Sequence, residues 1–150
     1  MSPEKLEEQH KLFVLQSVES GQVWGLHCKE GWANADSCEF EEVIVYPFWS
    51  SAELAQSCAI QEWKIYQPKS LDLAEFLENW CVGMYKEYIL AGINWNEQME
   101  GKELDSLDLA LQIIQELKRR NVQLKYKLYK NQAELERVLL EVITDERHSV

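Results

Sequence analysis

The stretch from Asp105 to Glu146 most restricts the folds open to this chain, because it contains neither glycine nor proline. Strong helix formers dominate it, and one uninterrupted helix of this length would span about 60 Å at 1.5 Å per residue. That is roughly twice the diameter of a small domain. The sequence therefore predicts a long C-terminal helix, and its apolar side needs a partner.

Apolar side chains recur along this helix at alternating spacings of three and four, which is typical of the seam of a coiled coil. Two asparagines interrupt the seam, and buried asparagine at such positions commonly sets the register of paired helices. We therefore expect a homodimer through the C-terminal helix. Two other arrangements stay open: a break near Asn131 that folds the end back, or cover by another protein. The predicted seam consists of Ile114, Leu117, Asn121, Leu124, Leu128, Asn131, Leu135, Val138 and Val142.

The rest of the chain mixes helical and strand patterns. Helices are expected at 3–19, 50–62 and 71–90, strands at 22–29, 32–33 and 41–48, and a short strand or extended loop at 92–96. The helix near residue 50 follows from a capping box, with Ser50 as N-cap and Glu53 three residues later. These elements predict an α+β fold, in which helices pack on a small antiparallel sheet. We divide the chain into an acidic globular domain, 1–104, and a helical extension, 105–150.

The net charge of −11 lies entirely in the first of these parts, because acidic and basic residues balance in 105–150. Such an acidic body repels nucleic acid and anionic membranes. No apolar run is long enough for a transmembrane helix, and the N-terminus lacks the apolar core of a secretory signal. We therefore expect a cytoplasmic protein whose four widely spaced cysteines are reduced thiols.

The chain contains no recognisable nucleophile motif and no phosphate-binding glycine loop. His27, Cys28 and Cys38 offer three soft ligands, but no fourth follows at the spacing of a zinc site. The lysines and arginines between 118 and 130 spread around the predicted helix, as expected of a solvated surface rather than a nucleic-acid site. The sequence thus predicts no catalytic residue, no metal and no cofactor, and nothing in it argues for an enzyme.

One tryptophan stands in a polar context. Asn94, Trp95 and Asn96 follow Gly92 closely, so we predict an exposed aromatic anchor at these three residues. The other five tryptophans are expected in the core, with their ring N–H groups bonded to the backbone.

The chain carries the motifs Gly31-Trp32-Ala33, Pro47-Phe48-Trp49, Glu62-Trp63, Pro68-Lys69-Ser70-Leu71-Asp72-Leu73 and Phe76-Leu77-Glu78-Asn79-Trp80. Together these motifs resemble the bacterial family known as domain of unknown function 2750. The resemblance covers about residues 10–112, and the spacing of its motifs is specific. Where a Leu-Pro-Gly-like helix end is expected, this chain has Cys81-Val82-Gly83, and the chain beyond about residue 115 looks like an addition. The resemblance implies a small cytosolic α+β domain and brings no catalytic residues.

Three functions are consistent with these observations. The first, which the seam and the uneven charge favour, is a non-enzymatic interaction or regulatory protein that acts through protein–protein contacts. The second is an acidic inhibitor or immunity-type protein that neutralises a basic toxin or nuclease, since complementary charge speeds association. The third is a small-molecule-binding domain or enzyme with a tryptophan-lined pocket.

Overall fold

Two small β-sheets form the centre of the fold in the computed structural model, which describes residues 1–148. The first sheet is antiparallel, with the strand order β2 (Gly31–Trp32), β1 (Gln22–Cys28) and β5 (Gln67–Asp72). The second has the order β3 (Ala35–Asp36), β4 (Ile44–Phe48), β6 (Leu90–Ile93) and β7 (Lys102–Leu104). Trp24 and Trp49 join the sheets by reciprocal backbone hydrogen bonds of 2.8 and 2.7 Å. The α+β class is confirmed.

The sheet arrangement differs from the expected single antiparallel sheet. There are two sheets, and β4 pairs with β6 in parallel, whereas the other neighbouring strands run antiparallel. The parallel pair follows from the long helical connection between β4 and β6, since parallel neighbours require such a crossover.

Serine and glycine set the ends of the first helices. Helix α1 (Pro3–Ser20) begins where the Ser2 hydroxyl accepts a hydrogen bond from the Lys5 N–H, and it ends at Gly21, whose φ is +74°. Helix α2 (Ala52–Ser57) is shorter than expected and is followed by the 3₁₀ turn η1 (Gln61–Trp63). Its N-cap is Ser51 rather than Ser50, because the Ser51 hydroxyl accepts the Leu54 N–H.

The helix expected at 71–90 is interrupted by a π-helical turn. Helix α3 (Leu73–Glu75) leads into the π turn η2 (Phe76–Trp80) and then into α4 (Cys81–Lys86). The Cys81 N–H donates to the Phe76 carbonyl, five residues back, so this turn holds one residue more than an α-helical turn. Phe76, Leu77 and Glu78 are all buried, although they are consecutive.

The C-terminal stretch forms two helices instead of one. Helix α5 (Ser106–Arg119) and helix α6 (Gln132–His148) are separated by residues 120–131, which we call the strap. Asn121 ends α5 with a φ of +59°, and the Val122 N–H reaches the Leu117 carbonyl at 2.9 Å, as in a Schellman motif. Asn131 caps α6, because its Oδ1 accepts the Glu134 N–H at 2.9 Å. One continuous helix is therefore not formed, and the alternative of a break near Asn131 that folds the end back is the arrangement observed.

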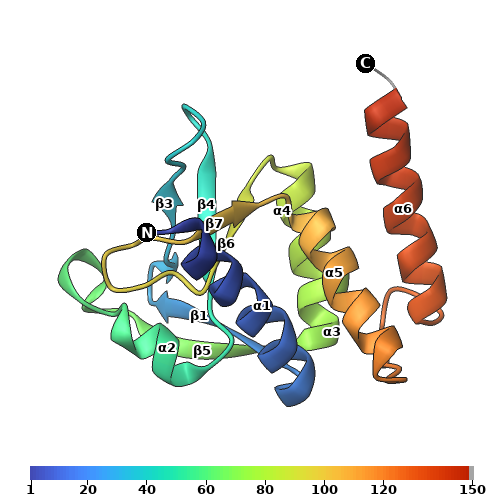
Figure 1. Ribbon diagram of the computed structural model, residues 1–150, viewed down its shortest axis with the longest axis horizontal. Helices are drawn as coiled ribbons and strands as arrows, with labels where there is room; N and C mark the ends of the chain where they lie inside the picture. Colours follow the sequence, from blue (N-terminus) through green and yellow to red (C-terminus); the bar gives the residue numbers. More distant parts are fainter. Residues whose placement is uncertain (149–150) are drawn as a thin grey trace.

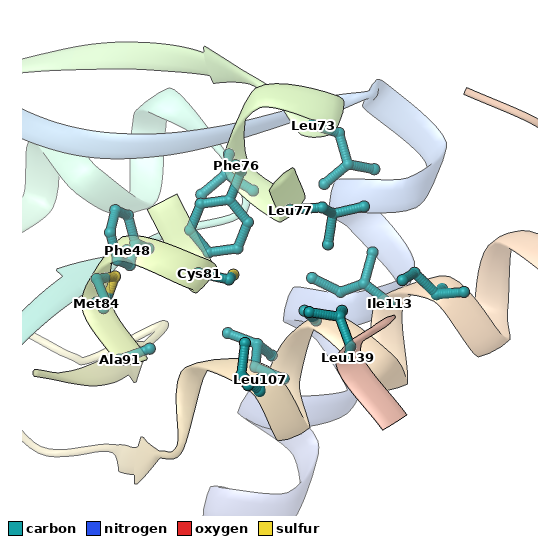
Figure 2. Packing of buried hydrophobic residues seen from close by; sticks show 14 of the residues in the cluster. Phe48, Leu73, Phe76, Leu77, Cys81, Met84, Ala91, Leu107, Ile113 and Leu139 are labelled. Atoms are coloured by element: carbon teal, nitrogen blue, oxygen red, sulfur yellow. The ribbon is translucent and has the colours of Figure 1, made fainter. Parts of the chain in front are cut away.

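Helix α6 lies next to α5, on the side away from the sheets (Figure 1). Its Leu135, Leu139 and Ile143 are buried in the main core, and Figure 2 shows Leu139 with Leu107 and Ile113 of α5 in this cluster. The core therefore contains side chains from both sides of residue 104, and the division of the chain at that residue stays a prediction. Within the described residues, no helix has both the length and the apolar character needed to cross a membrane.

Candidate functional site

An open groove of about 400 Å³ lies where β4, the π turn and α4 meet. Aromatic and apolar side chains form its walls, and carboxylates, an amide and a lysine stand among them. We call it the aromatic groove. It is lined by Tyr46, Glu75, Asn79, Trp80, Gly83, Met84, Lys86, Glu87 and Ile89.

Trp80 is the centre of an aromatic cluster, of which Trp80 itself and Tyr46 line the groove. Its ring meets those of Trp32, Phe48 and Tyr46 edge to face, with centroid distances of 4.9, 5.8 and 6.4 Å. Such edge-to-face pairs add to the stabilisation that burial provides. Trp32 in turn lies against β1, where a Cβ on Gly25 would come within 2.8 Å of the Trp32 ring. The wall of the groove is thus held by packing on a sheet strand.

Charged groups at the groove are available to a ligand. The Asn79 amide donates to Glu75 Oε1 at 2.7 Å and so orients that carboxylate. Lys86 and Glu87 are exposed and make no ion pair within the part of the chain that the structure describes. Beside the groove, the Lys69 ammonium lies 5.5 Å from the centroid of the Trp32 ring. This cation–π contact shows that the aromatic cluster can hold a cation.

A second hollow of about 490 Å³ adjoins the groove and shares Lys86 and Ile89 with it. We call it the Phe40–Tyr88 hollow after its two most exposed aromatic residues, which are 55% and 85% exposed. The loop that carries Phe40 also holds Glu39, Glu41 and Glu42. Its lining residues are Phe40, Val43, Tyr85, Lys86, Tyr88, Ile89, Leu90, Asp105, Ser106 and Glu146.

Trp95 is not an exposed anchor, so that prediction is wrong. The side chain is only 4% exposed, and its ring N–H donates to the Lys102 carbonyl at 3.0 Å. Gly92 and Gly101 leave room for it, since a Cβ on either would come within 2.6 or 2.3 Å of the Trp95 ring.

The neighbours of Trp95 have structural roles as well. Asn94 is buried with a φ of +46°, and its Oδ1 accepts the Ser50 N–H at 2.9 Å. Asn96 holds the turn before β7, because its Oδ1 accepts the N–H groups of Gln98 and Glu100. The polar context that suggested exposure therefore comes from asparagines that bind backbone groups.

The nine residues of the predicted seam do not form one continuous stripe. Ile114, Leu117 and Leu135 are buried in the core of their own chain, whereas Leu128 is 61% exposed. Asn121 and Asn131 mark helix ends, and Leu124, Val138 and Val142 are partly buried. Part of the apolar surface offered to a second copy is thus covered by the same chain, and the homodimer stays a prediction.

The basic residues after Leu117 are partly paired within the C-terminal part. Lys118 contacts Glu136 at 3.1 Å, and Arg119 and Arg120 both contact Glu116. The hydrogen bond from Arg119 and, to a smaller extent, the one from Arg120 lower the pKa of Glu116 to about 2.

The residues considered as soft metal ligands serve other contacts. The ring of His27 packs edge-on against Trp32 at 4.8 Å, and Cys28 and Cys38 are free thiols, as are Cys58 and Cys81. In residues 1–148, no three histidine, cysteine or acidic side chains are grouped so that they could hold a metal ion.

No sequence signal marks the aromatic groove, although Phe76-Leu77-Glu78-Asn79-Trp80 is one of the motifs of the family resemblance. A regular α-helix over 71–90 would place Trp80 on the core-facing side, whereas the π turn brings it to the groove. Phe40 and Tyr88 are isolated aromatics in polar surroundings, and only the fold brings them to one surface.

Comparisons with known proteins agree with the motifs quoted from the sequence. No curated protein and no solved structure matches the chain. A family model does match, from the middle of α1 to the middle of α5, and α6 lies beyond it. The chain belongs to the DUF2750 family of proteins of unknown function, whose model covers residues 10–113.

Proposed function

We propose that this protein is a non-enzymatic binding protein that takes a basic segment of another protein onto the aromatic groove and the Phe40–Tyr88 hollow. The observation that supports this most directly is the combination of an open aromatic wall with unpaired charge. Tyr46 and Trp80 form the wall, Glu75 and Glu87 stand beside it, and residues 1–104 carry the whole net charge of −11.

The groove suits a lysine or arginine side chain. The apolar stem of such a residue packs on Trp80 and Tyr46, while its charged end reaches Glu75 or Glu87. Lys69 on the ring of Trp32 is an example of this contact within the chain itself. Aromatic rings and carboxylates that line one groove favour a cation over a neutral group.

The adjoining hollow suits an apolar residue of the same segment. Phe40 and Tyr88 are largely exposed, and large apolar residues that remain exposed near a concave surface are typical of binding sites. The acidic loop beside Phe40 attracts a basic partner from a distance and speeds its association. The expected partner segment therefore carries basic residues next to an aromatic or branched apolar one.

An acidic inhibitor that neutralises a basic toxin or nuclease is the second candidate, and the concentration of negative charge in residues 1–104 favours it. It would use the same face, with a folded basic protein in place of a peptide segment. A small cationic ligand in the groove is the outcome that would instead support a small-molecule-binding domain or an enzyme.

The test is binding of a fluorescein-labelled peptide built of lysine and phenylalanine, followed by anisotropy at low and at moderate salt. A peptide with glutamate in place of lysine is the control ligand. We expect Trp80→Ala and Glu87→Lys each to weaken binding of the basic peptide about tenfold, or about 1.4 kcal/mol. Glu53→Lys on α2 is the matched charge control, because Glu53 is exposed and lies outside both hollows.

Equal losses in Glu87→Lys and Glu53→Lys would show that only overall charge matters, and would refute the assignment to the groove. Binding of spermidine or choline at the groove without binding of the peptide would favour the small-molecule function. Binding of neither would refute the proposal.

A further inference from the structure

Glu78 is a buried carboxylate that binds backbone rather than a cation. It is 3% exposed and lies in the π turn, two residues before Trp80. The Lys127 N–H lies 2.9 Å from both of its oxygens, and the Leu128 N–H lies 2.5 Å from Oε1. A buried carboxylate needs such donors, because burial without them would be costly.

The strap supplies these donors as an anion-binding concavity made of two successive N–H groups. A second buried side chain also holds the strap. Gln132, at the start of α6, donates to the Val122 carbonyl at 3.1 Å and accepts the Tyr126 hydroxyl at 2.8 Å. Two side chains from outside the strap thus bind it by hydrogen bonds, and its own Leu124, Tyr126 and Tyr129 pack against the core.

The π turn is held from two sides. On one side, Trp80 packs in the aromatic cluster, and on the other, Glu78 binds the strap. A π turn is rare and usually less favourable than an α-helical turn, so contacts of its side chains must maintain it. If the strap leaves, Glu78 loses its donors, and one of the two restraints on the turn is gone.

We propose that Glu78 is a positioning residue that links docking of the strap to the shape of the aromatic groove. With the strap docked, the turn holds Asn79 and Trp80 at the groove wall, and a ligand in the groove in turn favours the docked strap. The link to ligand affinity rests on the proposed function, whereas the link between strap and Trp80 does not. Coupling of this kind is reciprocal, because each event stabilises the same arrangement of the turn.

Three variants of the full chain test the coupling. Glu78→Gln removes the charge and puts an amide N–H₂ where an oxygen accepts. Gln132→Leu loosens the strap without touching the π turn. Glu141→Gln is the control, because Glu141 pairs only with Arg137 on the exposed side of α6 among the ion pairs of the described residues.

Each variant is measured in three ways by NMR and anisotropy: amide exchange at Lys127 and Leu128, the indole N–H signal of Trp80, and affinity for the lysine–phenylalanine peptide. We expect Glu78→Gln and Gln132→Leu each to speed amide exchange at Lys127 and Leu128 about 10- to 100-fold, since the hydrogen bonds from these N–H groups to a charged carboxylate are strong. We also expect the Trp80 signal to shift in both and peptide affinity to fall in step with strap opening, with no change in Glu141→Gln.

Faster exchange in the strap with an unchanged Trp80 signal would overturn the proposal, and so would unchanged exchange in Glu78→Gln. If the wild type binds no peptide but the Trp80 signal follows strap opening, the proposed function fails while the positioning role of Glu78 stands. Gln132→Leu keeps the test decisive if Glu78→Gln does not fold.

Discussion

Replacement of both Asn121 and Asn131 by leucine distinguishes two structures of the C-terminal part. If these residues interrupted a coiled-coil seam, leucine would remove a buried polar group and strengthen a dimer. In the present fold they are a helix end and a helix start, so leucine should destabilise the protein. The two hypotheses therefore predict opposite signs.

The expected loss can be estimated from the two contacts. Asn121 has a φ of +59°, a conformation that asparagine tolerates and that costs a residue such as leucine about 1 kcal/mol. Asn131 accepts the Glu134 N–H, and loss of an N-cap of this kind costs about 1 kcal/mol. The two sites share no partner, so the double variant should lose about 2 kcal/mol. For a chain of this size that lowers Tm by about 4–8 °C.

Urea and thermal unfolding give the stability, and light scattering over a wide dilution series gives the mass of the wild type and the variant. Asn121→Gly is the control, because glycine adopts the left-handed conformation freely and should change stability by less than about 0.5 kcal/mol. A double-leucine variant that is at least as stable as the wild type, with the mass of a dimer, would refute the helix-end assignment and support the seam.

Three further predictions concern other parts of the fold. Gly101→Ala should lower the free energy of unfolding by about 1–3 kcal/mol, because the added Cβ would lie 2.3 Å from the Trp95 ring. Gly83→Ala in helix α4 should raise it by about 0.5–1 kcal/mol, because nothing lies within 4 Å of a Cβ there, and chemical unfolding checks both signs. In the native protein a thiol reagent should modify the exposed Cys38 rapidly and leave Cys81 unmodified, because Cys81 is fully buried and burial raises its pKa; rapid labelling of Cys81 would contradict the packing. The pKa of Glu116 is lowered from its ordinary value of 4.5 to about 2, so the contribution of this carboxylate to stability is fully present above pH 4.5 and is lost as the pH falls towards 2. The difference in unfolding midpoint between the wild type and Glu116→Gln should therefore shrink over this pH range.

Local signals predicted much of the first half of the fold. The helix closed by Gly21 and the strands at β1 and β4 lie close to their expected positions, because caps and β-branched runs act over a few residues. Strand β5 was missed because Pro68 suggests a break, although proline is tolerated in an edge strand.

The C-terminal part shows why a repeat of threes and fours is ambiguous. The same spacing fits a seam between two chains and two shorter amphipathic helices of one chain that pack on a shared core. Asparagine fits both as well, since it occurs at seam positions and also at helix ends. Only the left-handed φ of Asn121 and the cap at Asn131 distinguish them, and neither is visible in a periodicity.

The candidate site was the least predictable part. The aromatic groove depends on a π turn whose extra residue places Trp80 in its cluster, and no residue type marks such a turn. Trp95 shows the opposite failure, because Gly92, which suggested an exposed loop, makes room for a buried ring together with Gly101.

The extra residue of the π turn also limits which changes in chain length this segment can tolerate. Deletion of one residue from Phe76–Trp80 would leave a regular α-helix whose later residues keep their orientation relative to the earlier ones, because the π turn holds one residue more than an α-helical turn. Cys81 and Met84 would stay in the core that they share with Leu73, whereas deletion of a residue from α4 itself would rotate the residues after it by about 100°. The core behind this turn can therefore accept the loss of one residue, whereas the aromatic groove, which Asn79 and Trp80 line, depends on the extra residue being present.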